Sequence, residues 1–174
     1  MFHSLKKIVL GAVFALAATA AFAQESSNQV AANTDWYVFQ EGTQCWTVSK
    51  PKETVNTDSS GRIKSVRRGE ILLFVSYAPS NGVKGQVSFA GGYPFASGSE
   101  VTLQIGGSNF TLFTENETAW AVTPEDDAKI IAAMKRGAAA TVSGYSARGT
   151  YTKDTFSLLG FTASVEDAAK RCNG

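Results

Sequence analysis

The chain has 174 residues, with 16 basic and 15 acidic side chains and a formal net charge of +1. Its one histidine, His3, lies in an N-terminal segment that we expect to be removed. A mature chain without histidine excludes Ser-His-Asp and Cys-His catalysis and histidine-ligated metal sites. The balanced charge gives no electrostatic footprint for nucleic acid. We therefore expect a protein that is not an enzyme and that needs no cofactor, metal ion or nucleic acid.

Residues 1–23 have the three parts of a secretory signal peptide. Lys6 and Lys7 precede an apolar run over residues 8–18, and a small-x-small cleavage site ends at Ala23. The alternative is a membrane anchor, but this run is shorter than the roughly 20 apolar residues that span a bilayer. Removal of Lys6 and Lys7 leaves 14 basic and 15 acidic residues, so the mature chain is close to neutral. No later apolar run is long enough for a membrane span. We expect the mature protein in the periplasm, at the outer surface or secreted.

The chain after the signal peptide divides into a short lead and one domain. Residues 24–33 are small and polar without periodicity, which predicts a flexible lead. Residues 34–174 have a length that suits a single domain with one core. Most of this domain consists of β-prone runs separated by turn signals, which we place at residues 36–39, 45–48, 62–68, 70–77, 84–90, 101–105, 110–115, 118–122, 138–146 and 151–159.

Three details of the strand prediction concern which residues are exposed and which are buried. Residues 50–60 are polar and contain Pro51, which predicts a loop before the basic strand at residues 62–68. The continuous apolar run at residues 70–77 predicts a strand that is packed on both faces. We expect the three tryptophans in the core, because packing is the default for aromatic residues in strands; they are Trp36, Trp46 and Trp120.

Two segments have the helical period. Thr123 is a good N-cap, Pro124 suits the first helical position and Gly137 is the expected stop of the first helix. Apolar residues from Phe161 to Cys172 lie on one face of a second helix. The predicted fold is therefore mainly β: an antiparallel β-sandwich of about ten strands with two short helices, the last at the C-terminus.

Cys45 and Cys172 are the two cysteines of the chain, and they form no CxxC motif. In an exported chain this predicts one structural disulfide, because thiols are oxidised outside the cytoplasm. The position of Cys172 on the core side of its helix fits a bond to a strand. Two free buried thiols are the alternative.

Two groups of residues are candidates for an interaction surface. The first is the basic run at residues 62–68, which suits anionic lipid, polysaccharide or a partner protein; the alternative is a solvated edge strand that its charges protect from aggregation. The second is the glycine-rich loop at residues 91–98, which would form a small-ligand or glycan site at the mouth of the sandwich. The candidate residues are Arg62, Lys64, Arg67, Arg68, Tyr93 and Phe95.

The acidic residues give a weaker signal. Three acidic residues at 125–127 follow Pro124 and are expected to stabilise the positive N-terminus of the first helix. Glu115 and Glu117 flank a turn and form a carboxylate pair only in sequence. A glycosidase needs its two carboxylates at a set separation in space, which this spacing does not establish.

Three stretches of the chain resemble one known family. Residues 144–150 (GYSARGT), residues 156–163 (FSLLGFTA) and a terminal helix that ends in Cys172 are similar to the invasion-associated locus B family of exported alphaproteobacterial proteins. The helix before them and the opening at residues 35–38 also fit, so the resemblance covers essentially the whole mature domain. Many members have a further cysteine where this chain has Gln40, which leaves Cys45 to pair with Cys172.

The resemblance implies a β-sandwich in the periplasm or at the outer surface, without established catalytic residues. Founding members of the family are linked to entry into host cells. We therefore expect a non-catalytic interaction protein that recognises an envelope or host protein. The alternative is a β-sandwich that binds a small ligand or a glycan.

Overall fold

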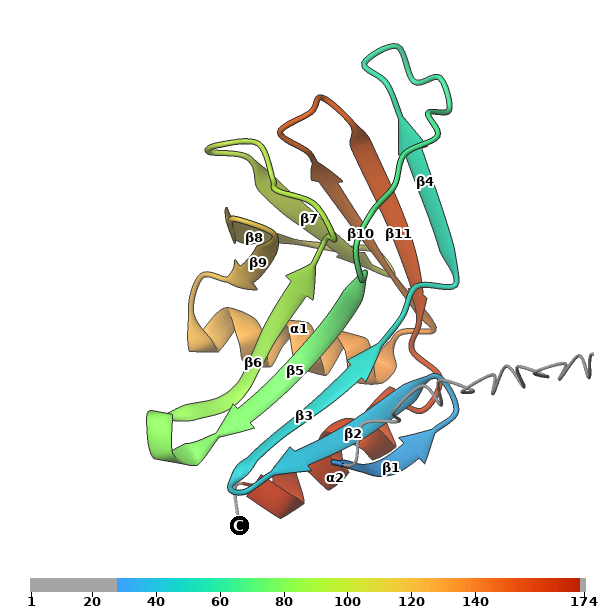
Figure 1. Cartoon of the computed structure of the whole chain (residues 1–174). Coiled ribbons are helices and arrows are strands. Elements are labelled where there is room, and N and C mark those ends of the chain that lie inside the picture. The colour runs from blue at the N-terminus through green and yellow to red at the C-terminus, as the bar shows by residue number, and fades with distance from the viewer. Residues whose placement is uncertain (1–27, 173–174) are drawn as a thin grey trace, which may run out of the picture.

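Eleven antiparallel strands form one continuous sheet in the computed structural model, which describes residues 28–172 (Figure 1). In chain order the elements are β1 Gln29–Asn33, β2 Trp36–Glu41, β3 Gln44–Ser49, β4 Glu53–Thr57, β5 Leu72–Ala78, the 3-10 helix η1 Pro79–Asn81, β6 Val83–Ala90, β7 Glu100–Ile105, β8 Ser108–Glu115, β9 Thr118–Ala121, α1 Pro124–Arg136, β10 Ala139–Tyr145, β11 Tyr151–Ser157 and α2 Phe161–Cys172. Across the sheet the order is β1-β2-β3-β5-β6-β9-β8-β7-β10-β11-β4.

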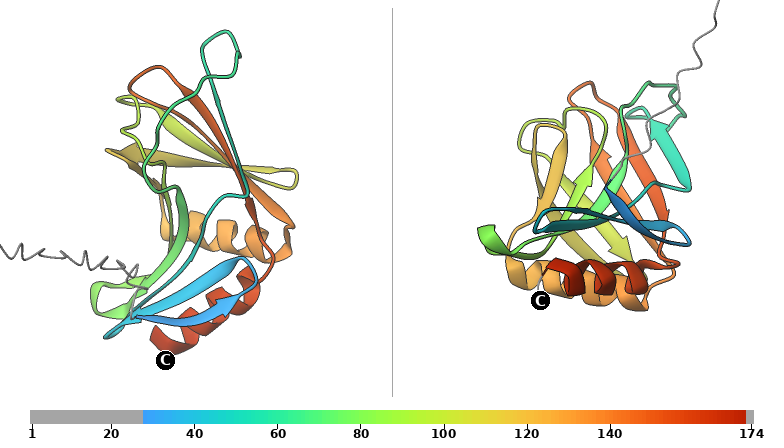
Figure 2. Two further views of the ribbon diagram at one scale, coloured as in Figure 1. Left: turned by 45° about the vertical axis from the view of Figure 1, so that its right-hand side comes forward. Right: turned by 60° about the horizontal axis from the view of Figure 1, so that its bottom comes forward.

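The sheet curls so that strands far apart in its order face each other (Figures 1 and 2). Phe89 in β6 meets Phe156 in β11 edge to face, with the ring centroids 6.2 Å apart. One face of the sheet is therefore the inner face, and its side chains alternate with outer ones as period-two strands require. The predicted antiparallel, mainly β fold is confirmed, with the two layers supplied by the two halves of one sheet.

The two helices close the same end of the curled sheet and lie side by side there (Figure 2, right). As predicted, α1 begins after Thr123, whose Oγ1 accepts a hydrogen bond from the Asp126 N–H at 3.1 Å, and it stops at Gly137. In α2, the ring of Phe161 packs edge to face against Trp36 of β2, with centroids 4.8 Å apart. Neither helix of residues 28–172 has the length and apolar character that a membrane span requires.

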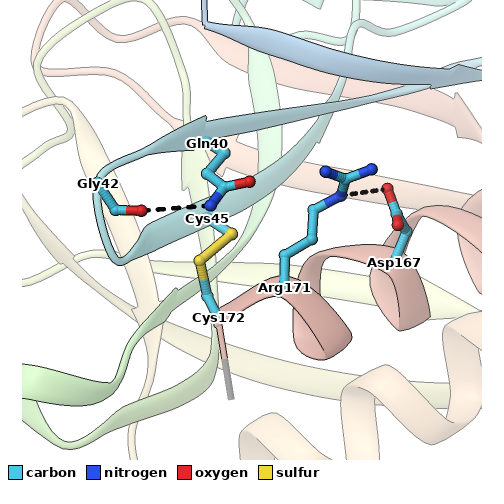
Figure 3. The surroundings of a disulfide bond; sticks show 6 residues. All are labelled: Gln40, Gly42, Cys45, Asp167, Arg171 and Cys172. Carbon is cyan, nitrogen blue, oxygen red and sulfur yellow. Dashed lines mark hydrogen bonds and ion pairs between the residues drawn. A yellow bond between two sulfur atoms is a disulfide. The ribbon is translucent and has the colours of Figure 1, made fainter. Parts of the chain in front are cut away.

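The predicted disulfide is confirmed. Cys45 of β3 is bonded to Cys172, the last residue of α2, with the Cα atoms 5.8 Å apart (Figure 3). Gln40 lies opposite Cys45 on β2, and its Nε2 donates to the Gly42 carbonyl at 3.3 Å. The bond therefore fastens the end of the chain to one of its first strands.

The prediction of a flexible lead over residues 24–33 is wrong for its second half. Gln29–Asn33 forms β1, which pairs with β2 at the edge of the sheet. The Asn33 side-chain N–H donates to Ser164 Oγ in α2 at 3.0 Å, so the start of the described chain is tied to its end. Its sequence, QVAAN, lacks the apolar alternation of a half-buried strand, and three of its five residues are exposed. The predicted signal peptide and residues 24–27 lie outside the described residues.

Two other boundaries differ from the prediction. The second edge strand, β4, lies within the predicted polar loop at residues 50–60. The basic run at residues 62–68 is an irregular connection whose Ile63 alone forms a bridge, to Thr57. β4 lacks the apolar alternation that marks a half-buried strand, which is why the sequence pattern placed it in a loop.

Candidate functional site

Several loops lie at the end of the sheet away from the helices (Figure 1). They line a cavity of about 490 Å³. We call it the basic cleft. Its walls come from the connection between β4 and β5, the connection between β6 and β7, and the two turns that follow β8 and β10. Its lining residues are Lys64, Val66, Arg67, Arg68, Gly92, Tyr93, Pro94, Glu117, Ser146, Ala147, Arg148, Thr150 and Thr152.

The structure brings four of the six predicted interaction residues together in this cleft: Lys64, Arg67, Arg68 and Tyr93. Arg62 is not among the lining residues, and its guanidinium pairs with Asp58 at 2.9 Å on the exposed loop. Phe95 is buried in the core, with its ring tilted toward Phe89. The two predicted groups thus form one site, from which Arg62 and Phe95 are excluded.

Arg68 has a structural role beneath the cleft. Its Nη1 and Nη2 donate to the two carboxylate oxygens of Asp154 in β11 at 2.7 and 2.6 Å. The Arg68 and Asp154 side chains are 6% and 0% exposed. Arg68 also donates twice to the Gly91 carbonyl, at 3.0 and 2.8 Å. Burial raises the pKa of the Asp154 carboxyl, and the hydrogen bonds from Arg68 oppose that rise. The charge of Arg68 is therefore already neutralised.

Tyr93 is also held within the protein. The Arg68 guanidinium lies over its ring at 4.9 Å from the centroid, and the ring of Phe95 packs against it edge to face. The Tyr93 hydroxyl is hydrogen-bonded to Thr152 Oγ1, and burial raises the pKa of this phenol. With these contacts the ring is a wall of the cleft, and it is not a free platform for stacking.

Two glycines allow the walls to approach closely. The Gly69 N–H donates to the Gly92 carbonyl at 2.8 Å, and Gly92 has a φ of +71°. A Cβ on Gly92 would lie 2.7 Å from the Gly69 carbonyl oxygen, so only glycine fits at this contact. The two connections are therefore locked together where they border the cleft.

Three cations remain for a ligand. Lys64 Nζ donates to Thr150 Oγ1 at 3.1 Å, while Arg67 and Arg148 are exposed. Within residues 28–172, none of the three has a carboxylate within 4.0 Å, and Glu117 is the one acidic residue in the lining. Arg148 was missed by the sequence prediction because it stands alone in the turn after β10, outside any basic run.

A second surface lies on the outer face of the sheet, over β2, β3 and β5. Side chains that alternate with the core residues form a hollow of about 480 Å³ there. The rings of Phe39 and Trp46 stack with centroids 5.7 Å apart and planes 7° from parallel. We call this surface the outer aromatic face; its apolar members are Tyr37, Phe39, Trp46, Val48, Leu72 and Phe74.

The outer aromatic face continues along one row of directly paired residues. Phe74 pairs with Ser88, Ser88 with Trp120, and Trp120 with Phe113 on β8. The rings of Trp120 and Phe113 stack with centroids 5.6 Å apart. Trp36 is buried as predicted, but Trp46 and Trp120 are partly exposed on the outer face. Residues 70–77 were expected to pack on both faces of the strand. This expectation is wrong, because Phe74 lies on the outer face and is partly exposed.

The acidic side chains that the sequence singles out lie in different surroundings in the structure. Asp127 in the first turns of α1 accepts a hydrogen bond from the Val87 N–H at 2.7 Å, and burial raises its pKa. Glu117 lines the basic cleft, whereas Glu115 is not among its lining residues. Residues 28–172 contain no group of three or more acidic, histidine or cysteine side chains that would hold a metal ion.

Comparison with known proteins gives a family and solved structures with a similar fold. A family model described as invasion associated locus B (IalB) protein matches residues 28–169. The crystal structure of invasion associated protein b from Bartonella henselae is similar with a TM-score of 0.56 and 11% sequence identity. The similarity covers 83% of this chain and 98% of that chain, and at this identity it shows the fold alone. A search of curated proteins finds no match.

Proposed function

Because the chain belongs to the invasion associated locus B (IalB) family, we propose that it is a non-catalytic, extracytoplasmic interaction protein that binds a protein partner on its outer aromatic face. The disulfide between Cys45 and Cys172 supports an oxidising compartment such as the periplasm or the cell exterior. Residues 28–172 contain no histidine, so they hold no Ser-His-Asp or Cys-His arrangement, which supports binding in place of catalysis.

The observation that carries this proposal is the exposure of large aromatic side chains on the outer face of the sheet. Tyr37 is 40% exposed, and Phe39, Trp46 and Phe74 are partly exposed beside it. Contiguous apolar patches of this kind on a soluble protein mark interaction sites, because leaving them in water costs free energy.

The surroundings of the patch have the anatomy of a protein interface. Polar groups at its border include the ion pair between Lys50 Nζ and Glu70 Oε2 at 2.7 Å, with both side chains largely exposed. An apolar, aromatic centre inside a polar rim is typical of protein–protein contacts. The partner is therefore an envelope or host protein that presents an apolar surface. The similar protein from Bartonella henselae is described as invasion associated, which supports a partner on a host cell.

A pair of tyrosines makes a matched test. A photo-crosslinking amino acid placed at Tyr37, on the outer aromatic face, is expected to form reproducible adducts with a protein partner in intact cells or host-cell extract. The same amino acid at Tyr151, which lies on β11 and is 48% exposed, is the control. Adducts at position 37 that disappear when Trp46→Thr is added support the proposal. Equal adducts at both positions, or none at position 37, contradict it.

A further inference from the structure

We propose that the basic cleft is a second binding site, separate from the outer aromatic face, for a ligand that carries a multiply charged oxyanion. The ligand is a small molecule or sugar with a phosphate group or several carboxylates. The anion is bound by Lys64, Arg67 and Arg148. Glu117, the lone acidic residue of the lining, lowers the net positive charge of the cleft.

The first support is the distribution of charge over residues 28–172. Of the 14 lysines and arginines in this range, Arg68 is buried against Asp154 and six others have a carboxylate within 4.0 Å. These six pairs are Lys50–Glu70, Lys52–Asp35, Arg62–Asp58, Lys129–Asp126, Lys135–Glu166 and Arg171–Asp167. The three cleft cations have no such match, yet they come together from two connections that are far apart in sequence. The other four unmatched cations lie on four different elements; they are Lys84, Arg136, Lys153 and Lys170.

The second support is the type of donor that faces the cavity. Arginine presents a planar fork of N–H donors that matches the oxygens of phosphate and carboxylate. Ser146 adds a hydroxyl, because its Oγ accepts the Thr150 N–H at 3.0 Å and its own proton has no acceptor among the described residues. Positive charge and hydroxyl groups together suit an oxyanion that also carries hydroxyl or ether oxygens.

The third support is the rigidity of the cleft floor. Arg68 and Asp154 form a buried pair with two hydrogen bonds, and the contact between Gly69 and Gly92 fixes the two connections against each other. A site that is organised before binding loses less conformational entropy when the ligand arrives. The volume of about 490 Å³ also lies in the range of small-ligand pockets.

The contacts of Tyr93 separate this proposal from recognition of a neutral sugar. Neutral sugars are commonly held by stacking on an aromatic face, but the ring of Tyr93 is already covered by Arg68 and Phe95. Charge is therefore the property by which the cleft selects its ligand.

Titration calorimetry of the domain at low ionic strength tests the proposal. The probes are pyrophosphate and citrate, with sucrose as the neutral control. We expect pyrophosphate or citrate to bind with a dissociation constant below about 1 mM and sucrose not to bind. The stronger of the two anions identifies phosphate or carboxylate chemistry. Added salt weakens the binding because the attraction is electrostatic.

Three variants locate the site. Arg67→Gln with Arg148→Gln is expected to weaken anion binding at least tenfold. Arg136→Gln with Lys170→Gln lowers the net charge equally, but on the helices, and is expected to change the affinity by less than twofold. Glu117→Gln removes the acidic residue of the lining and is expected to tighten binding severalfold. Absence of binding by both anions, or equal losses in the two double variants, overturns the proposal. Unchanged thermal unfolding in each variant confirms that the fold is intact.

Discussion

Arg68 and Asp154 are joined by two parallel hydrogen bonds although 86 residues separate them in sequence. This pair attaches the long connection before β5 to the middle of β11. It lies directly beneath the basic cleft, so the stability of the fold and the shape of the cleft depend on the same contact.

Replacing Arg68 by Met should destabilise the protein by about 3–5 kcal/mol, because Asp154 is then buried without a partner. Urea unfolding followed by tryptophan fluorescence measures the change. The double variant Arg68→Met with Asp154→Leu removes both charges and is expected to recover much of the loss. A single variant with wild-type stability would show that the pair has no structural role.

Replacing Cys45 and Cys172 by Ala should lower the free energy of unfolding by about 2–5 kcal/mol, because the unfolded chain is no longer closed into a loop. The bond joins residues 127 positions apart, so it constrains most of the chain. Thermal unfolding of the wild type with and without reductant provides a second measurement of the same effect. Equal melting temperatures for the oxidised protein and the double variant would contradict this expectation.

Gly160→Ala should be strongly destabilising, by about 1–3 kcal/mol from backbone strain alone. Gly160 has a φ of +88°, and a Cβ there would lie too close to the Asn33 carbonyl oxygen to be accommodated without movement of β1. Amide hydrogen exchange should therefore accelerate in β1. Gly107→Ala is the control, since a Cβ at Gly107 meets nothing within 4 Å. Similar stabilities for the two variants would argue against the close contact between β1 and the start of α2.

Tyr77 should make the protein sensitive to alkaline pH. Burial raises the pKa of its phenol to about 12, compared with about 10 in an unfolded chain. Below pH 10 the phenol is protonated in both states. Between pH 10 and 12 it ionises only in the unfolded state, so the free energy of unfolding falls by up to about 2–3 kcal/mol.

Tyr77→Phe is expected to remove this part of the pH dependence, as measured by urea unfolding between pH 8 and 12. Tyr151→Phe replaces a well-exposed ring and serves as the control. If the wild type and Tyr77→Phe lose stability in parallel, Tyr77 does not titrate as its burial indicates.

The elements that the sequence predicted well are those fixed by local chemistry. Thr123, Pro124 and Gly137 determine the two ends of α1 through contacts within a few residues. The disulfide followed from the export signal and the number of cysteines. The general arrangement of short antiparallel strands followed from turn residues at regular spacing.

The features that the sequence did not reveal depend on contacts between distant residues. In the sequence, Arg68 cannot be distinguished from its neighbour Arg67. In the structure, Arg68 is buried against Asp154 on another strand, whereas Arg67 is exposed. Trp46 and Phe74 are apolar in sequence, but which face of the sheet is outer is decided by how the sheet curls. Arg148 belongs to the cleft because the turn after β10 folds next to residues far earlier in the chain.

The bond between Cys45 and Cys172 also determines what happens when the backbone is cut. A protease that cleaves the exposed connection at residues 58–71 produces two fragments, and each retains one of the two cysteines. The fragments stay covalently attached, so the nicked protein migrates as a single species until a reducing agent is added. In surroundings rich in secreted proteases, a cut in this loop releases neither half of the protein.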